Sequence, residues 1–234
     1  MKKMMMLIFA TSLFFIFIQA KAMINEYEEI AKSNIVDVSL YAKKMNGDYT
    51  DFKIDFRGSM LSRPYWINTA NPTFSPLIKY EDINNDGKNE LIIILTKGTG
   101  TGILEQEAHV FHIQNQKVTS QFVEVTVEVL VDDPMAIVFK NVKSELLPTT
   151  AQIEIGDKEY TIDIKPLDIQ ADHLFANVYF GNKITFDVKD YLLIAKIGAQ
   201  IAPAGGYIGD IHITYMFKDK MYQAKSIEFK PYKP

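Results

Sequence analysis

Apolar and polar residues alternate along much of this chain, and this period of two restricts its fold more than any other feature. Valine occupies every second position in residues 123–129, and DFKIDFR, residues 51–57, alternates phenylalanine or isoleucine with charged side chains. IEIGDKEYTIDI, residues 153–164, places two such runs around a Gly-Asp turn, and residues 211–229 repeat that arrangement. Successive side chains of a strand point to opposite faces, so the pattern predicts antiparallel sheet with one polar face.

Residues 24–45 follow a different period and predict an N-terminal amphipathic helix. Asn25 and Glu28 have the spacing of a capping box, and Asn46-Gly47 supplies a stop signal. The apolar residues recur at steps of three and four, as on one face of a helix: Ile24, Tyr27, Ala31, Ile35, Val38, Ala42 and Met45. We expect this helix to pack on the sheet.

The expected fold class is therefore α+β, mainly antiparallel β sheet with one N-terminal amphipathic helix. The strand–helix alternation of doubly wound nucleotide-binding folds is missing. Residues 141–150 form the best candidate boundary, which would separate a helix-plus-β domain, residues 23–142, from a β domain, residues 143–234. A single continuous domain over residues 23–234 is equally compatible with this length.

The first 22 residues have the organisation of a cleaved secretory signal. Lys2 and Lys3 precede an apolar stretch, and Ala20-Lys21-Ala22 is a small-x-small cleavage site. The apolar stretch is shorter than the roughly 20 residues that span a bilayer, and no later segment is apolar enough to span one. The sequence therefore predicts a secreted or extracytoplasmic protein without a membrane span once the signal is removed.

The charge and the absence of cysteine exclude several functions. Removal of residues 1–22 takes three of the 25 basic side chains and none of the 29 acidic ones, which leaves a net charge of −7. An acidic chain without a basic cluster does not suit nucleic acid, whose phosphates require neutralisation. The lack of cysteine removes disulfides, thiol catalysis and cysteine-ligated zinc.

The stretch DINNDGKNELIIIL, residues 82–95, has the oxygen-donor spacing of a calcium loop. Asp82, Asn84 and Asp86 alternate before a glycine, Glu90 follows, and Lys88 would contribute its carbonyl oxygen. The residue at the twelfth position is an isoleucine inside a strand, so the loop is not an EF-hand. Polar residues are also common in ordinary tight turns, which is the alternative interpretation.

This loop resembles the Asp-x-Asn-x-Asp-Gly-x-x-Glu/Asp loops of FG-GAP and VCBS-type repeat proteins. The resemblance covers about 15 residues once, and implies one calcium ion that holds the loop entering a strand. Over most of the chain after residue 22, this loop and segments such as RPYWINTANPTFSPLI, LFANVYFG and YMFKDKMYQAKSIEFKP resemble an uncharacterised group of exported proteins from spore-forming bacilli. That resemblance implies export and carries no catalytic residues.

KGTGTG, residues 97–102, matches neither a dinucleotide-binding nor a P-loop pattern, because an alternating strand rather than a helix follows it. It predicts a hairpin turn at the opposite end of its strand from the acidic loop.

The remaining polar residues favour a non-enzymatic protein. His109 and His112 are three residues apart, which on a strand directs them to opposite faces and away from a shared metal. Glu105 and Glu107 share a face, as a carboxylate pair for acid–base chemistry would, but solvated sheets carry many such pairs. No serine-nucleophile motif is present.

Two functions follow from these patterns. The first is a secreted or cell-surface binding or structural module stabilised by calcium at Asp82, Asn84, Asp86, Lys88 and Glu90. The alternative is a carbohydrate-binding or hydrolytic cell-envelope protein that uses Tyr65, Trp66 and nearby acids. A buried Trp66 favours the first, and an exposed Trp66 beside carboxylates favours the second.

Overall fold

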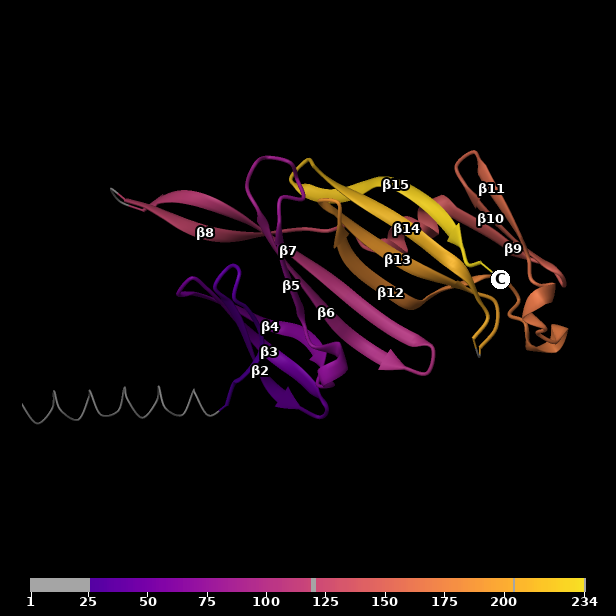
Figure 1. Cartoon of the computed structure of the whole chain (residues 1–234), viewed down its shortest axis with the longest axis horizontal. Coiled ribbons are helices and arrows are strands. Elements are labelled where there is room, and N and C mark those ends of the chain that lie inside the picture. The colour runs from indigo at the N-terminus through magenta and orange to yellow at the C-terminus, as the bar shows by residue number, and fades with distance from the viewer. Residues whose placement is uncertain (1–25, 119–120, 204, 234) are drawn as a thin grey trace, which may run out of the picture. The chain divides into compact units, whose positions relative to one another are not determined.

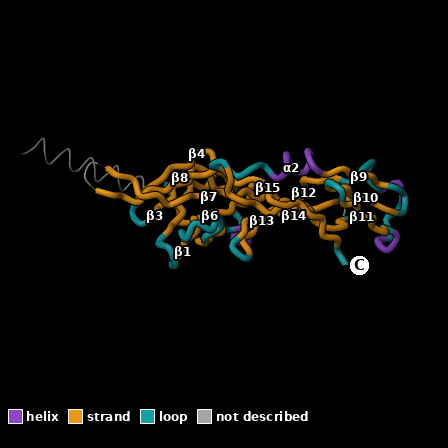
Figure 2. The backbone as a smooth tube through the Cα atoms, turned by 90° about the horizontal axis from the view of Figure 1, so that it is seen from above, coloured by secondary structure: helices purple, strands orange, loops and turns teal. Residues whose placement is uncertain are grey.

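The fold is mostly β. A computed structural model describes residues 26–118, 121–203 and 205–233 (Figures 1 and 2). Of these described residues, 66% lie in strands and 8% in helices. The expected signal, residues 1–22, lies outside the described residues. No helix in the described ranges is long and apolar enough to cross a membrane.

The strands and the α-helix are, in chain order, β1 (Glu28–Ser33), β2 (Val38–Met45), β3 (Asp48–Phe56), β4 (Ser59–Thr69), β5 (Leu77–Glu81), β6 (Glu90–Gly100), β7 (Ile103–Val118), β8 (Gln121–Val129), α2 (Pro134–Asn141), β9 (Val142–Leu146), β10 (Thr150–Ile155), β11 (Lys158–Asp163), β12 (Tyr179–Lys189), β13 (Leu192–Gln200), β14 (Tyr207–Lys218) and β15 (Met221–Pro231). Short 3₁₀ turns lie at Pro72–Phe74, Lys165–Leu167 and Ala171–His173.

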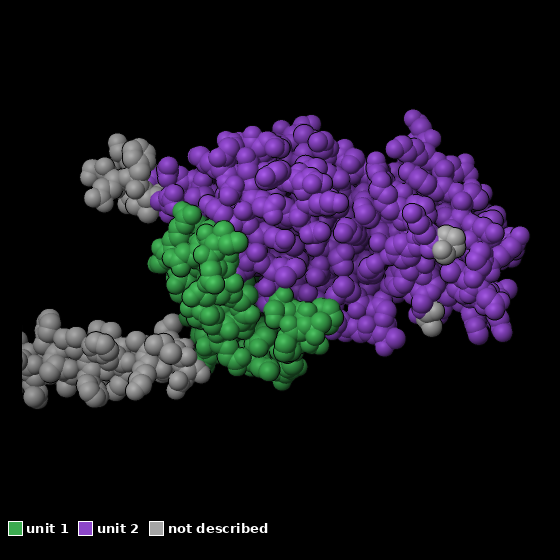
Figure 3. Space-filling view, viewed as in Figure 1, with its two compact units in different colours: residues 1–75 green, residues 76–234 purple. Residues whose placement is uncertain are grey.

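The chain divides into two compact units, which Figure 3 colours separately. Unit 1 comprises residues 1–75 and unit 2 residues 76–234. The boundary considered from the sequence, between residues 142 and 143, lies inside unit 2, at the start of β9. Strands from both sides of that point join one sheet, because β12 pairs with β7.

Unit 1 contains a four-stranded antiparallel sheet in the order β1-β2-β3-β4. The alternation predicted for residues 51–57 is confirmed: Phe52 and Ile54 are fully buried and Phe56 is 3% exposed. Trp66 of β4 packs edge-on against Phe52, with ring centroids 5.9 Å apart. This face of the sheet therefore carries the aromatic and aliphatic side chains.

The predicted N-terminal helix is wrong, and with it the α+β class. Ile24 and Asn25 lie outside the described residues, and the remainder of that segment forms β1, a turn and β2. In β2 the buried residues are Val38, Leu40 and Ala42, which alternate. The period-two pattern was hidden because Val38 and Ala42 fit both periods, while Leu40 fits only the strand.

Side-chain exposure and turn geometry also show that this segment is not a helix. Ile35 and Met45, two members of the supposed helical stripe, are 91% and 56% exposed. Asn46-Gly47 is a two-residue hairpin turn between β2 and β3, with φ angles of 53° and 92°. Asn-Gly adopts such paired positive φ values readily, so its role is to join strands rather than to end a helix.

Unit 2 is built on a large sheet in the order β15-β14-β13-β12-β7-β6-β5, with β8 paired to β7 beyond that path. All neighbours are antiparallel except β12 and β7, which are parallel over a short register. A second, three-stranded sheet has the order β11-β10-β9. The hairpins predicted around Gly156-Asp157 and Asp219-Lys220 are confirmed as β10–β11 and β14–β15.

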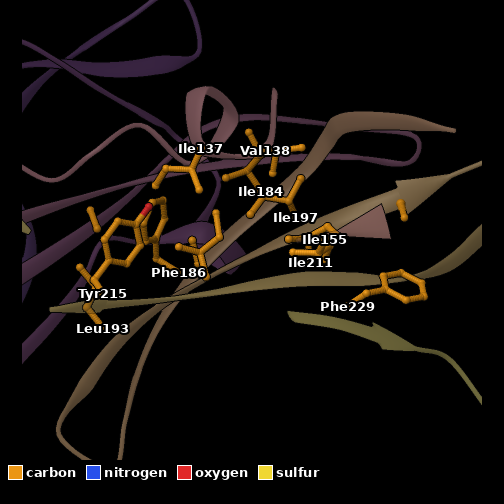
Figure 4. Close-up of a cluster of buried hydrophobic side chains, with 14 of the residues drawn as sticks. Ile137, Val138, Ile155, Ile184, Phe186, Leu193, Ile197, Ile211, Tyr215 and Phe229 are labelled. Carbon is orange, nitrogen blue, oxygen red and sulfur yellow. The ribbon is translucent and has the colours of Figure 1, made fainter. Parts of the chain in front are cut away.

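The core of unit 2 lies where α2 and β10 pack on the large sheet. Ile137 and Val138 of α2 belong to one buried cluster with Ile184 and Phe186 of β12 (Figure 4). β10 contributes alternate residues to the same cluster, Ala151, Ile153 and Ile155. Apolar burial of this kind contributes about 25 cal/mol per Å² and is the main stabilising term of the fold.

The start of α2 is specified locally. Asp133 is the N-cap, and its carboxylate accepts a hydrogen bond from the Ala136 backbone N–H at 2.8 Å. Pro134 stands in the first turn, where its missing N–H costs nothing. With Ile137 and Val138 facing inward, Phe139 is left 77% exposed.

Candidate metal centre

The acidic loop connects β5 to β6, so it enters a strand as the sequence predicted. Asn85 and Gly87 have positive φ angles of 61° and 83°. Such angles reverse the chain tightly and are favourable for asparagine and glycine. The loop can therefore turn the donor side chains on either side of these two residues toward one another.

Asp82 organises the tip of the loop. Its two carboxylate oxygens accept hydrogen bonds from the backbone N–H groups of Asp86, at 3.2 Å, and Gly87, at 2.9 Å. Asp86 N–H is shared with Asn84 Oδ1 at 2.8 Å. Lys88 enters the network through its backbone N–H, which donates to Asp86 Oδ1 at 2.9 Å.

Asn84 lies between two carboxylates. Its amide nitrogen Nδ2 donates to Asp86 Oδ2 at 3.2 Å and to Glu90 Oε1 at 3.1 Å. The other oxygen of Glu90 accepts the backbone N–H of Ile83 at 2.9 Å. Hydrogen bonds thus link all five predicted positions in one loop.

Glu90 is the unusual member of this network because it is only 1% exposed. Burial disfavours its charged form and, with the nearby carboxylates of Asp86 and Asp82, raises the pKa of Glu90 to about 7. The hydrogen bond from Ile83 opposes that shift. A buried carboxylate close to two further acids is a local excess of negative charge.

The donor chemistry suits calcium, which binds carboxylate, amide and carbonyl oxygens. The side chains offer three carboxylates, from Asp82, Asp86 and Glu90, and one amide oxygen, from Asn84. The present orientation is that of a hydrogen-bonded loop: across the described ranges, no group of three or more histidine or acidic side chains stands in an arrangement that could hold a metal ion. For Asn84 to act as a ligand, its amide would have to rotate so that oxygen replaces nitrogen between the carboxylates.

The glycine-rich stretch has no part in this loop. Gly100 pairs with Ile103 in the β6–β7 hairpin, and Gly102 has a φ angle of 73° in the turn. The hairpin predicted there is confirmed, at the opposite end of β6 from Glu90.

The two histidines of β7 lie in separate environments, as their three-residue separation predicted. His112 is buried, with Nε2 3.0 Å from the hydroxyl of Tyr222 and its ring 4.6 Å from that of Phe217. Burial lowers the pKa of His112 below its usual value. His109 lies on the other face, where Nδ1 is 3.0 Å from Glu128 Oε1.

A second concentration of titratable groups surrounds His109, in a cavity of about 360 Å³. The sequence indicated that Glu105 and Glu107 share a face of β7, since they alternate. It did not indicate that Lys97 of β6 and Glu128 of β8 lie on the same wall. Those contacts require the pairing of three strands, which no local pattern specifies.

The aromatic pair proposed for sugar binding is divided by the sheet. Trp66 is 9% exposed and packs on Phe52, whereas Tyr65 is 92% exposed. Adjacent residues of a strand face opposite ways, so the two rings do not form one platform.

Comparison of the chain with protein-family models, with curated proteins and with solved structures finds no match. The likeness of residues 82–95 to FG-GAP and VCBS-type loops, and of the longer segments to the exported bacillar group, therefore stays a prediction from the residues.

Proposed function

We propose that this protein is a secreted or cell-surface binding or structural module whose β5–β6 loop is stabilised by one calcium ion. The observation that carries the proposal is the burial of Glu90, 1% exposed, in a loop where the negative charges of Asp86 and Asp82 add to the effect of burial on its pKa. Burying a carboxylate is costly unless the charge is compensated. A divalent cation would compensate this one and its two neighbours together.

The role proposed for the ion is structural. Asp82 and Glu90 stand at the two ends of the loop, and Glu90 is the first residue of β6. The next five residues of β6, Leu91–Leu95, are buried. An ion that ties the loop together would therefore stabilise entry into a strand whose first half is buried.

The burial of Trp66 favours this module over the carbohydrate-binding or hydrolytic alternative. That alternative needs the tryptophan ring exposed beside acids as a stacking surface. Tyr65 alone retains such exposure.

Thermal unfolding of residues 23–234 in millimolar CaCl₂ or in EGTA tests the calcium proposal. Calcium at about ten times its dissociation constant stabilises the fold by about 1.4 kcal/mol, which for a chain of this length raises Tm by a few degrees. Asp86→Ala removes a ligand and should abolish the calcium-dependent rise. MgCl₂ should produce a smaller rise, because magnesium gives up its water reluctantly.

Asp157→Ala is the matched control, since Asp157 is an exposed turn aspartate in the β10–β11 hairpin. It should retain the whole calcium effect. An unchanged Tm in wild-type protein with and without calcium, or an equal calcium effect in wild type and Asp86→Ala, would reduce the loop to an ordinary turn.

A further inference from the structure

Two cavities in unit 2 share part of their lining. The first, of about 360 Å³, includes the charged groups around His109, and the second, of about 400 Å³, is lined largely by apolar and aromatic residues. Glu105, Met135 and Ile184 line both. We call the two cavities together the α2 groove, because α2 contributes residues to each of them. Its size is that of small-molecule sites.

One end of the α2 groove is acidic. Five carboxylates line the first cavity, with one lysine, Lys97, and one histidine, His109: Glu105, Glu107, Glu128, Asp132 and Asp133. The Nζ of Lys97 lies 3.4 Å from a carboxylate oxygen of Glu105 and 3.4 Å from one of Glu107. The protein's own ammonium group thus occupies part of this end, and an excess of negative charge remains around it.

The other end is apolar and aromatic. Phe139 of α2 is 77% exposed and Tyr179 of β12 is 48% exposed, and Val178 and Phe180 complete the wall. The floor of the first cavity continues this surface through Ile184 and Phe186. An exposed phenylalanine beside a cavity is apolar area that a ligand could cover.

Close packing holds the shared wall in place. A Cβ added at Gly181, where φ is 116°, would lie 3.4 Å from Cε of Met135. Met135 therefore lies close against the β12 backbone, in the first turn of a helix capped by Asp133. Its flexible thioether can adapt to the shape of a bound group.

We propose that the α2 groove binds an amphiphilic organic cation, in which an ammonium group is joined to an apolar ring or chain. Charge complementarity selects the cation: carboxylates outnumber ammonium groups five to one in the first cavity. The apolar part would cover Phe139 and Tyr179 while the ammonium group meets the carboxylates. The groove is separate from the calcium loop, so this binding does not depend on calcium.

Isothermal titration calorimetry with 4-phenylbutylamine tests the proposal on residues 23–234. We expect saturable binding of one molecule per chain. The neutral analogue 4-phenylbutan-1-ol and the anion 4-phenylbutyrate should each bind at least tenfold more weakly, since hydrogen bonds to charged groups contribute roughly tenfold or more in affinity. Butylamine, which lacks the ring, should also bind at least tenfold more weakly.

Three variants test separately how the aromatic ring, the carboxylates and the lysine of the groove affect amine binding. Phe139→Ala and the double variant Glu107→Gln with Asp133→Asn should each weaken amine binding at least about fivefold, and asparagine at 133 preserves the helix cap. Lys97→Met should tighten binding, because it removes the competing ammonium group and keeps an apolar stem. Tyr65→Ala and Glu154→Gln remove an exposed aromatic ring and an exposed acid outside the groove and should change nothing.

Absence of saturable amine binding would overturn the proposal. So would equal binding of the amine and the alcohol, or the same loss of affinity in Glu154→Gln as in the groove variants, because the amine would then respond only to the general negative charge. A circular dichroism spectrum unchanged from wild type establishes that each variant is folded before its affinity is compared.

Discussion

At the scale of single residues, Asn84 lies between two carboxylates of the acidic loop. Its amide nitrogen donates to Asp86 and Glu90 at 3.2 and 3.1 Å. Two partly positive hydrogens thus partly compensate the charge of two carboxylates, one of which is buried. A change of Asn84 to aspartate alters the charge of the loop without altering the shape of the side chain, because an amide and a carboxylate have the same shape.

We therefore predict opposite effects of Asn84→Asp with and without calcium. In EGTA the variant loses both donors and adds a fourth carboxylate, so we expect a lower free energy of unfolding, by about 1–3 kcal/mol. If the proposed calcium ion binds, the added carboxylate is a further ligand, so in millimolar calcium the calcium-dependent rise in Tm should exceed that of wild type. Urea unfolding in the two buffers measures both.

Asn84→Ala is the companion variant, since it removes the same donors without adding charge. A calcium effect in Asn84→Asp no larger than in Asn84→Ala would contradict a calcium ligand at this position.

The burial of His112 makes the stability of the folded protein depend on pH. Burial lowers the pKa of His112 in the folded protein, and the carboxylate of Asp86 only partly opposes this. Below about pH 6.5, the ordinary pKa of histidine, His112 takes up a proton in the unfolded state but stays neutral in the folded state until the pH is lower. The contribution of His112 to stability is thus fully present above pH 6.5 and is lost as pH falls.

We expect His112→Gln to flatten the loss of stability between pH 7.5 and pH 5.5, by at most about 1.4 kcal/mol per pH unit. Urea unfolding at the two pH values measures this, and each protein is compared with itself, so a general loss of stability does not enter. Equal slopes in variant and wild type would mean that His112 is accessible to protons in the folded state.

At the scale of elements, the β14–β15 pair depends on a glycine. A Cβ added at Gly209 would lie 2.5 Å from the carbonyl oxygen of Lys230 and 2.5 Å from Cζ of Phe229. The carbonyl belongs to the paired strand and cannot rotate away without breaking the pairing. Close approach of two backbones is the reason for glycine here.

Gly209→Ala should therefore lower the free energy of unfolding by roughly 1–3 kcal/mol, as in other overpacked sites. Gly100→Ala is the control, because its Cβ would meet only Ile103 at 3.7 Å, an ordinary contact. It should change stability by less than about 0.5 kcal/mol. Similar losses in the two variants would show that strand propensity rather than close approach determines the cost.

At the scale of the whole molecule, unit 2 contains its own hydrophobic core. The buried cluster runs from Ile83 to Phe229 and includes residues of α2, of β10 and of the large sheet. A chain of this length can bury enough apolar surface to fold alone.

We expect residues 76–234, expressed alone, to unfold cooperatively with temperature and to give the circular dichroism of a β protein. A fragment carrying Ile197→Ala, which truncates a fully buried side chain of that cluster, should melt at a clearly lower temperature. A fragment without a cooperative transition would mean that the core of unit 2 depends on unit 1.

The sequence by itself determined the features that depend on neighbours along the chain. Alternation predicted β3, β8 and the hairpins of β10–β11 and β14–β15, since the two faces of a strand require it. Turn chemistry predicted the glycine hairpin after β6, and donor spacing predicted that Asp82, Asn84, Asp86 and Glu90 meet in one loop. In each case the residues concerned lie in one continuous stretch of the chain.

Only the tertiary structure decided the rest. Residues 28–45 satisfy a helical period as well as a strand period, and pairing of β2 with β3 selects the strand. The α2 groove takes residues from β6, β7, β8, α2 and β12, and the raised pKa of Glu90 follows from its burial. Burial and long-range pairing are properties of segments far apart in the chain, so no local pattern could have specified them.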